Sequence, residues 1–192
     1  MRKIEYIWKS LLNQALEKRE FSFRQQDLAK QLGLSSSTVN LAMSPLRQMG
    51  AVRIGKRVSE IVDPEKILYH WANHHRLQPV NSVRVNLPIL QIEGLLPDGS
   101  IPTAYTAVRE RFGEPPADYD KVYVYHPHPQ AIIDRFTAEI TSGPPNLFIL
   151  LPDPLLKSLS LSHLFVDLWN LPDWYAKDFV NFVKSKFNEL LP

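Results

Sequence analysis

The sequence predicts an α/β protein with two chemically different parts, and three observations support this. Apolar residues recur at helical spacing through residues 3–49, whereas short β-type runs alternate with helical runs after residue 80. Residues 1–80 contain 13 Lys and Arg against 7 Asp and Glu, while residues 81–192 contain 9 against 13. Most of the 16 prolines follow residue 80, at the expected ends of elements. Such charge asymmetry suggests a nucleic-acid or membrane surface on the basic side.

The composition of the 192-residue chain excludes several classes of protein. The chain has no Cys, which rules out disulfides, thiolate zinc sites and a Cys nucleophile and suits a cytoplasmic protein. It has no run of about 18 apolar residues, so we expect no transmembrane helix. Charges at Arg2, Lys3 and Glu5 come too early for a signal peptide, so none is expected.

Three helices are expected between residues 3 and 49. The first covers residues 3–19, the second covers about 24–32, and the third runs from Ser36 towards Met49. Gly33 should end the second helix in a left-handed conformation, and Ser35 should cap the third. The expected inward-facing residues are Ile4, Ile7, Trp8, Leu11, Leu12, Ala15, Leu16, Leu28, Ala29, Leu32, Val39, Ala42, Met43 and Leu46.

The second and third helices have the spacing of a helix-turn-helix motif. Ala29 is a small residue at the expected helix crossing, Gly33 lies in the turn, and Val39 would fill the crossing from the third helix. The alternative is a generic pair of packed helices. Two alternating segments, Ala51–Ile54 and Val58–Val62, then predict a β-hairpin, which in this position would be the wing of a winged helix.

The candidate DNA-binding residues lie in the third helix and the hairpin. Those of the helix are Ser36, Ser37, Thr38, Asn40 and Arg47, and those of the hairpin, expected at its tip to contact phosphates, are Arg53, Lys56 and Arg57. A solvated hairpin tip is the alternative for the last three. Asn can pair with adenine, whereas Ser and Thr discriminate bases weakly, so we expect modest sequence specificity. Pro45 should kink the third helix near Leu41 or make it restart at Pro45.

A fourth helix should begin at Asp63-Pro64-Glu65 and end near Leu77, followed by a linker at residues 78–82. These limits predict a winged helix-turn-helix domain at 1–62, a connecting helix and linker at 63–81, and an α/β domain at 82–192. His70 and His74 have the spacing for a shared metal, but a satisfied or solvated pair is favoured because no Cys or acidic residue adjoins them. His126 and His128 are interpreted in the same way.

The acidic half is expected to hold a small sheet with surrounding helices. The predicted strands are 82–87, 122–125 and 146–151, and the predicted helices are 89–96, 104–112, 129–136, one ending at Trp169 and 174–190, with one turn at 155–158.

This half contains no recognisable active site, so we expect no enzyme activity, no cofactor and no metal. A phosphate-binding glycine loop and a nucleophile elbow are both missing. Asp153 and Lys157 match only part of a nuclease carboxylate–lysine core. Asp167 and Asp173 are interpreted as a helix-surface residue and a cap. Trp169, Trp174 and Tyr175 could line a partner site, although core packing is expected for at least two of them.

Three segments resemble the AbiEi-type antitoxins and transcriptional regulators of type IV toxin–antitoxin systems. They are Leu28–Gly33 with Ser37–Val39, Val62–Ala72 with its Asp-Pro-Glu start and Trp-Ala end, and Leu164–Leu171. The resemblance is weakest at residues 82–145. It implies a winged helix that binds double-stranded DNA and represses its own operon, and a C-terminal domain that helps to neutralise a nucleotidyltransferase-like toxin. A palindromic operator would further imply a homodimer.

The sequence leaves two other hypotheses open. One is a protein-interaction module whose winged helix does not bind DNA, and the other is a small enzyme with an unrecognised site in the α/β half. Residues 1–62 contain 11 Lys and Arg against 5 Asp and Glu, so the basic charge belongs to the predicted DNA-binding module. The acidic half is expected to stay off the DNA.

Overall fold

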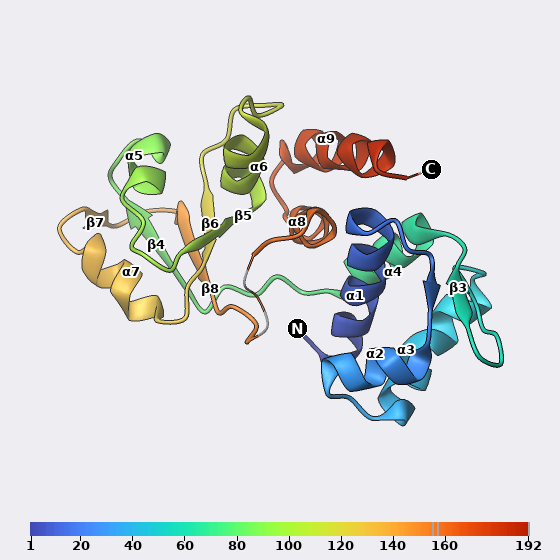
Figure 1. Ribbon diagram of the computed structural model, residues 1–192. Helices are drawn as coiled ribbons and strands as arrows, with labels where there is room; N and C mark the ends of the chain where they lie inside the picture. The colour runs from blue at the N-terminus through green and yellow to red at the C-terminus, as the bar shows by residue number, and fades with distance from the viewer. Residues whose placement is uncertain (155, 157, 192) are drawn as a thin grey trace. The chain divides into compact units, whose positions relative to one another are not determined.

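The computed structural model describes residues 1–154, 156 and 158–191 of the chain (Figure 1). The chain divides into two compact units. The first comprises Met1–His75, Ser160–Val166 and the chain from Lys184 onward, and the second comprises Arg76–Leu159 and Asp167–Val183. Each unit combines helices with strands, so the predicted α/β class is confirmed. Within the described part of the chain, no helix has both the length and the apolar character to cross a membrane.

The first unit has the predicted order of helices followed by a hairpin. Its elements are α1 (Lys3–Glu17), β1 (Ser22–Phe23), α2 (Gln25–Leu32), α3 (Ser36–Gln48), β2 (Val52–Arg53), β3 (Ser59–Ile61) and α4 (Pro64–His74). The strands form an antiparallel sheet in the order β1-β3-β2. Strand β1 was not predicted, because two residues are too short to show a period of two.

Helix α1 packs against α3 and α4 and supplies much of the core of this unit. Most residues predicted to face inward are buried, among them Ile7, Trp8, Leu11 and Leu12 of α1 and Val39, Ala42 and Leu46 of α3. Ile67, Leu68 and Trp71 of α4 are buried as well. The indole Nε1 of Trp8 also donates a hydrogen bond of 3.0 Å to the carbonyl of Ala42. This bond fixes the middle of α3 to α1.

The turn between α2 and α3 follows the predicted local rules. Gly33 has φ = 62°, which is the left-handed conformation that ends a helix. The hydroxyl of Ser35 accepts the Thr38 amide hydrogen at 3.2 Å and so caps α3. Helix α3 continues through Pro45 without a restart. The carbonyl that Pro45 leaves without a helical donor belongs to Leu41, which is exposed and can be hydrated.

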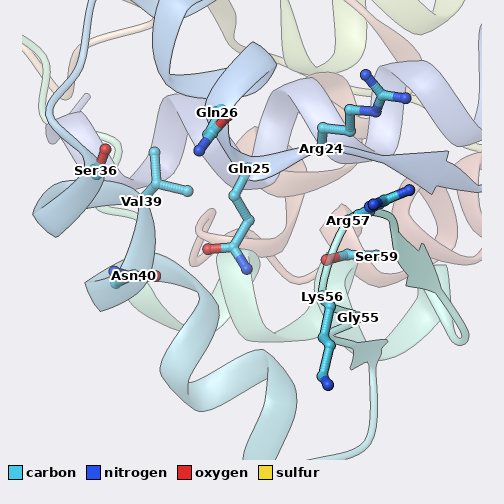
Figure 2. A pocket seen from close by; sticks show the side chains of 10 residues that line it. All are labelled: Arg24, Gln25, Gln26, Ser36, Val39, Asn40, Gly55, Lys56, Arg57 and Ser59. Carbon is cyan, nitrogen blue, oxygen red and sulfur yellow. The ribbon is translucent and has the colours of Figure 1, made fainter.

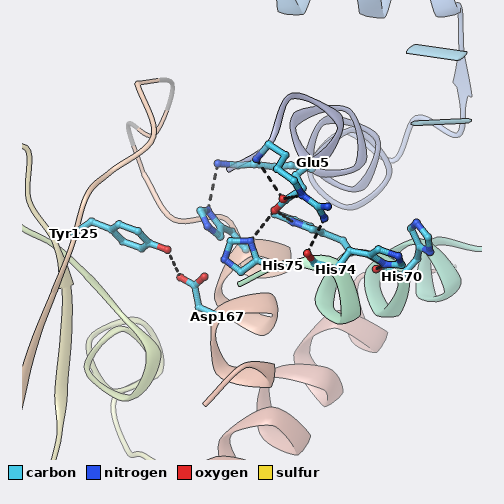
Figure 3. A network of polar contacts seen from close by, with 10 residues as sticks. Glu5, His70, His74, His75, Tyr125 and Asp167 are labelled. Atoms are coloured by element: carbon cyan, nitrogen blue, oxygen red, sulfur yellow. Dashed lines mark hydrogen bonds and ion pairs between the residues drawn. The ribbon is translucent and has the colours of Figure 1, made fainter. Parts of the chain in front are cut away.

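Helix α4 begins as predicted, with Asp63 accepting the Lys66 amide hydrogen at 3.0 Å, but it ends at His74 and not near Leu77. His75 is extended, and its ring Nδ1 lies 2.7 Å from Oε2 of Glu5 in α1 (Figure 3). The buried Glu5 carboxylate also accepts hydrogen bonds from Arg2 and Trp71. Burial alone raises the pKa of Glu5, but the hydrogen bonds from His75 and Arg2 lower it to about 2.

The second unit is built on a five-stranded mixed sheet in the order β5-β6-β8-β4-β7, with β6 and β8 parallel and the other neighbours antiparallel. Its elements are β4 (Asn81–Val85), α5 (Ile89–Gly94), β5 (Ile101–Thr103), α6 (Ala104–Phe112), β6 (Val122–Tyr125), α7 (Pro129–Arg135), β7 (Ile140–Thr141) and β8 (Leu147–Leu150). Residues of α8 (Leu161–Trp169) and α9 (Ala176–Glu189) are divided between the units. Strands β5 and β7 were not predicted. Leu155 and Lys157, part of the predicted turn and of the considered nuclease core, lie outside the described residues.

The two faces of this sheet differ in chemistry. Helices α5 and α7 cover one face, where the buried residues are apolar: Val85, Ile92, Val122, Val124, Ile132, Phe136, Leu147 and Ile149 (Figure 1). The other face bears Tyr123 and Tyr125. The Tyr123 hydroxyl donates to Asp173 at 3.4 Å, and the Tyr125 hydroxyl donates to Asp167 at 2.9 Å, the latter shown in Figure 3. Tyr105 of α6 adds a bond of 2.8 Å to Asp173. Burial raises the pKa of Tyr123 and Tyr105, so both hydroxyls remain donors.

Two predictions for this unit are wrong. Asp167 is fully buried and not on a helix surface, because Thr103 and Tyr125, from strands distant in sequence, donate hydrogen bonds to its carboxylate. At least two of Trp169, Trp174 and Tyr175 were expected to pack in the core. Only Tyr175 is buried, whereas Trp169 and Trp174 are 41% and 85% exposed.

Candidate nucleic-acid interface

Three segments of the first unit surround a hollow of about 560 Å³. The start of α2, the start of α3 and the turn of the β2–β3 hairpin form its walls, and Figure 2 shows Gln25 projecting into it between Asn40 on α3 and Lys56 on the hairpin. The lining residues are Arg24, Gln25, Gln26, Ser36, Val39, Asn40, Gly55, Lys56, Arg57 and Ser59. The wall made by α3 is the part of a helix-turn-helix that enters the major groove.

The hairpin turn depends on a glycine. Strands β2 and β3 pair antiparallel, with Val52 opposite Ile61. A Cβ added to Gly55 would lie 2.0 Å from the carbonyl oxygen of Val58, a distance that no side chain can adopt without moving the backbone. The turn therefore folds back tightly, and Lys56 and Arg57 follow at its tip, where they border the hollow.

The hollow is electropositive. Arg24, Lys56 and Arg57 line it from two sides, all three residues are exposed, and its lining contains no acidic residue. In the described part of the chain, none of these three cations forms an ion pair. Free guanidinium and ammonium groups around an open, polar surface are suited to phosphate oxygens, which form the charged edges of a DNA groove.

The structure brings together four of the eight candidate residues at this hollow, Ser36, Asn40, Lys56 and Arg57. Two others support the cap of α3, because the hydroxyls of Ser37 and Thr38 lie 2.8 and 2.9 Å from that of Ser35.

The last two candidates, Arg47 and Arg53, line a separate hollow. Arg53 lies in β2 and not at the hairpin tip, and its guanidinium pairs with Glu60 of β3 at 2.8 Å. Glu60 therefore offsets the charge of Arg53, whereas the charges of Lys56 and Arg57 face solvent.

Sequence reasoning missed Arg24, Gln25 and Gln26 as part of the site. They lie at the start of α2, and only α3 and the hairpin had been considered for contacts. The signal was present, because in a helix-turn-helix the first helix crosses the DNA backbone. An arginine and two glutamines at the beginning of that helix are donors in a suitable place for phosphates.

The histidine pairs considered as metal ligands make other contacts. Nδ1 of His74 donates to the carbonyl of His70 at 2.7 Å, and the His70 ring packs edge-on against Trp8 with centroids 4.6 Å apart. In the second unit, Nδ1 of His126 accepts the backbone amide hydrogen of His128 at 3.0 Å.

The helices, turn and basic hairpin of the first unit define a winged helix-turn-helix domain. Residues 7–68 match the family model of the Crp-like helix-turn-helix domain, which spans the interval from α1 to α4. This match supports a DNA-binding regulator. No curated protein and no solved structure gives a significant match to the chain.

Proposed function

We propose that this protein is an autorepressing, antitoxin-like transcriptional regulator that binds duplex DNA through the winged helix and a protein partner through the second unit. The observation that most strongly supports DNA binding is the hollow where Lys56 and Arg57 of the hairpin face Ser36 and Asn40 of α3. Cations on one wall and amide and hydroxyl groups on the other are the groups that contact phosphates and base edges, respectively.

The DNA-binding site has a rigid support. The bond from Trp8 to Ala42 and the buried packing of α1 on α3 hold the recognition helix on the body of the unit. The Ser35 cap fixes the start of α3, where Ser36 lies. A preorganised helix loses little conformational entropy on binding.

A binding role without catalysis is proposed for the second unit. Its buried carboxylates have structural partners: Arg109 pairs with Glu93 at 2.6 Å, and Thr103 donates to Asp167 at 2.7 Å. The exposed Trp174 offers a large apolar surface of the kind enriched at protein interfaces. The antitoxin-like role itself, with a nucleotidyltransferase-like toxin as partner and a homodimer on a palindromic operator, is supported by the three segments that resemble AbiEi-type regulators.

The test is binding of the full chain to the duplex upstream of its own gene, and to an unrelated duplex of equal length, over a series of salt concentrations. The proposal predicts affinity that falls steeply with salt for both duplexes, with tighter binding to the upstream duplex. Affinity that changes neither with salt nor with sequence would contradict it and would favour the protein-interaction module.

The antitoxin-like part is tested separately by the genes next to this one and by co-purification. An adjacent nucleotidyltransferase-like gene, whose product co-purifies with the full chain, is the expected result. A gene without such a neighbour, and regulation without a protein partner, would leave a DNA-binding regulator and overturn the antitoxin-like role.

A further inference from the structure

We propose that the outward face of α3 reads A·T base pairs in the major groove, with Asn40 and Leu41 as its specificity-determining residues. This inference rests on the proposed function, because it names the DNA sequence class that the same site would prefer. It depends on the chemistry of exposed side chains on one helix face and on the residue types missing from that face.

Asn40 is placed to recognise adenine. Its side chain is exposed on the α3 wall of the hollow (Figure 2), and in the described part of the chain its amide forms no hydrogen bond. An asparagine amide offers one donor and one acceptor, which match N7 and the N6 amino group of adenine. Guanine presents two acceptors at the same edge, so the amide oxygen of Asn40 would face O6 of guanine without a hydrogen between them.

Leu41 supplies the apolar half of the same recognition. It is 66% exposed, whereas the next two residues, Ala42 and Met43, are buried at 1% and 3% exposure. An exposed leucine beside an asparagine fits the pattern that an A·T pair presents, because the thymine opposite the adenine carries a C5-methyl group in the major groove. Contact between Leu41 and that methyl group would remove apolar surface of both from water.

The face lacks the residues that read G·C pairs. Specific contacts to guanine are made mostly by Arg or Lys, and α3 has no basic residue before Arg47, which lines a different hollow. Glu or Asp usually accepts the hydrogen bond from the cytosine amino group, and the α3 sequence contains neither residue. The cations that border the hollow, Arg24 and Lys56 among them, lie outside α3 and are suited to phosphates.

The first experiment selects binding sites for the full-length protein from a random-sequence duplex library. The inference predicts enrichment of consecutive A·T pairs at the centre of the selected site. The second experiment measures the affinity of the selected duplex after chemical substitution of single bases. Deoxyuridine in place of thymine removes only the methyl group, and 7-deazaadenine in place of adenine removes only the N7 acceptor.

Variants assign each effect to a side chain. Replacement of thymine by deoxyuridine should weaken wild-type binding by about fourfold, the value of one methyl-sized contact, and should not weaken binding of Leu41→Ala. Asn40→Ala should lose between about 5-fold and 100-fold on the selected duplex and should become insensitive to 7-deazaadenine. Both residues are exposed, so neither variant should affect folding. Gln48→Ala, exposed at the end of α3, is the matched control.

The outcomes separate this inference from the proposed function. Salt-dependent binding with enrichment of G·C pairs, with no enrichment, or with equal sensitivity of wild type and variants to the base analogues would overturn the A·T preference and leave DNA binding intact. Failure to bind any duplex at low salt would overturn the proposed function, and the A·T preference with it.

Discussion

The ring Nδ1 of His75 donates a hydrogen bond of 2.7 Å to Oε2 of Glu5, although the two residues lie 70 positions apart in the sequence (Figure 3). Nε1 of Trp71 donates to the same oxygen at 3.2 Å, and Nε of Arg2 donates to the other at 2.8 Å. The buried carboxylate therefore joins the first turn of α1 to the end of α4. Because α1 also packs against α3, this cluster supports the proposed recognition helix.

Glu5→Gln should lower the free energy of unfolding by about 3 kcal/mol near neutral pH. The pKa of Glu5 is about 2 in the folded protein, below its usual value of 4.5, so the unfolded state binds more protons between these values. The contribution of Glu5 is therefore complete above pH 4.5 and is lost as the pH falls through 2. Denaturant unfolding of both proteins from pH 7 to 2 measures the difference, which should shrink over that window.

The matched control for this prediction is Glu17→Gln, because Glu17 is an exposed carboxylate on the same helix. Its effect should stay within about 0.5 kcal/mol at every pH, as is usual for surface substitutions. If the free energies of unfolding of wild type and Glu5→Gln differed by the same amount at every pH, the role assigned to the carboxylate charge would be contradicted.

Ser35→Ala should lower the free energy of unfolding by about 1 kcal/mol, because the amide hydrogen of Thr38 would lose its acceptor at the start of α3. Ser35→Gly should lose only a few tenths of a kcal/mol, since glycine leaves room for water to solvate that amide. Thermal unfolding of the two variants measures the contrast. Equal losses would show that the hydroxyl does not act as a cap.

Gly55→Ala should weaken DNA binding by about tenfold, because the new Cβ would force the Val58 carbonyl away and displace the hairpin tip with its two cations. Gly94→Ala is the control, since a Cβ there meets open space within the ordinary helix α5. Binding titrations at one salt concentration compare the two. Unchanged affinity of Gly55→Ala for DNA would show that binding does not depend on the shape of the hairpin turn.

The first unit was largely predictable because its signals are local. A left-handed glycine at Gly33, a serine cap at Ser35 and the spacing of buried residues in α3 each act within a few residues, and each is found as predicted. Half of the candidate DNA-binding residues meet at one hollow, because a single helix and a single hairpin position all of them.

The features that sequence reasoning missed depend on partners far apart in the chain. Strand β1 exists because Ser22 pairs with Glu60, and two residues alone show no pattern. Asp167 has the spacing of a surface residue on a short helix, but hydroxyls from β5 and β6 make its burial favourable. The ion pair of Arg53 with Glu60 likewise follows from strand register, which the residue types alone do not specify.

The salt dependence of binding by a wing variant tests the central claim most directly. Lys56→Ala with Arg57→Ala should flatten the slope of log affinity against log salt by about two, because two phosphate contacts are lost. Lys18→Ala with Arg19→Ala, the same change of charge on exposed residues away from the hollow, should leave the slope unchanged. The proposed interface would be contradicted if the Lys56→Ala, Arg57→Ala variant kept the wild-type slope. It would also be contradicted if both double variants flattened the slope equally.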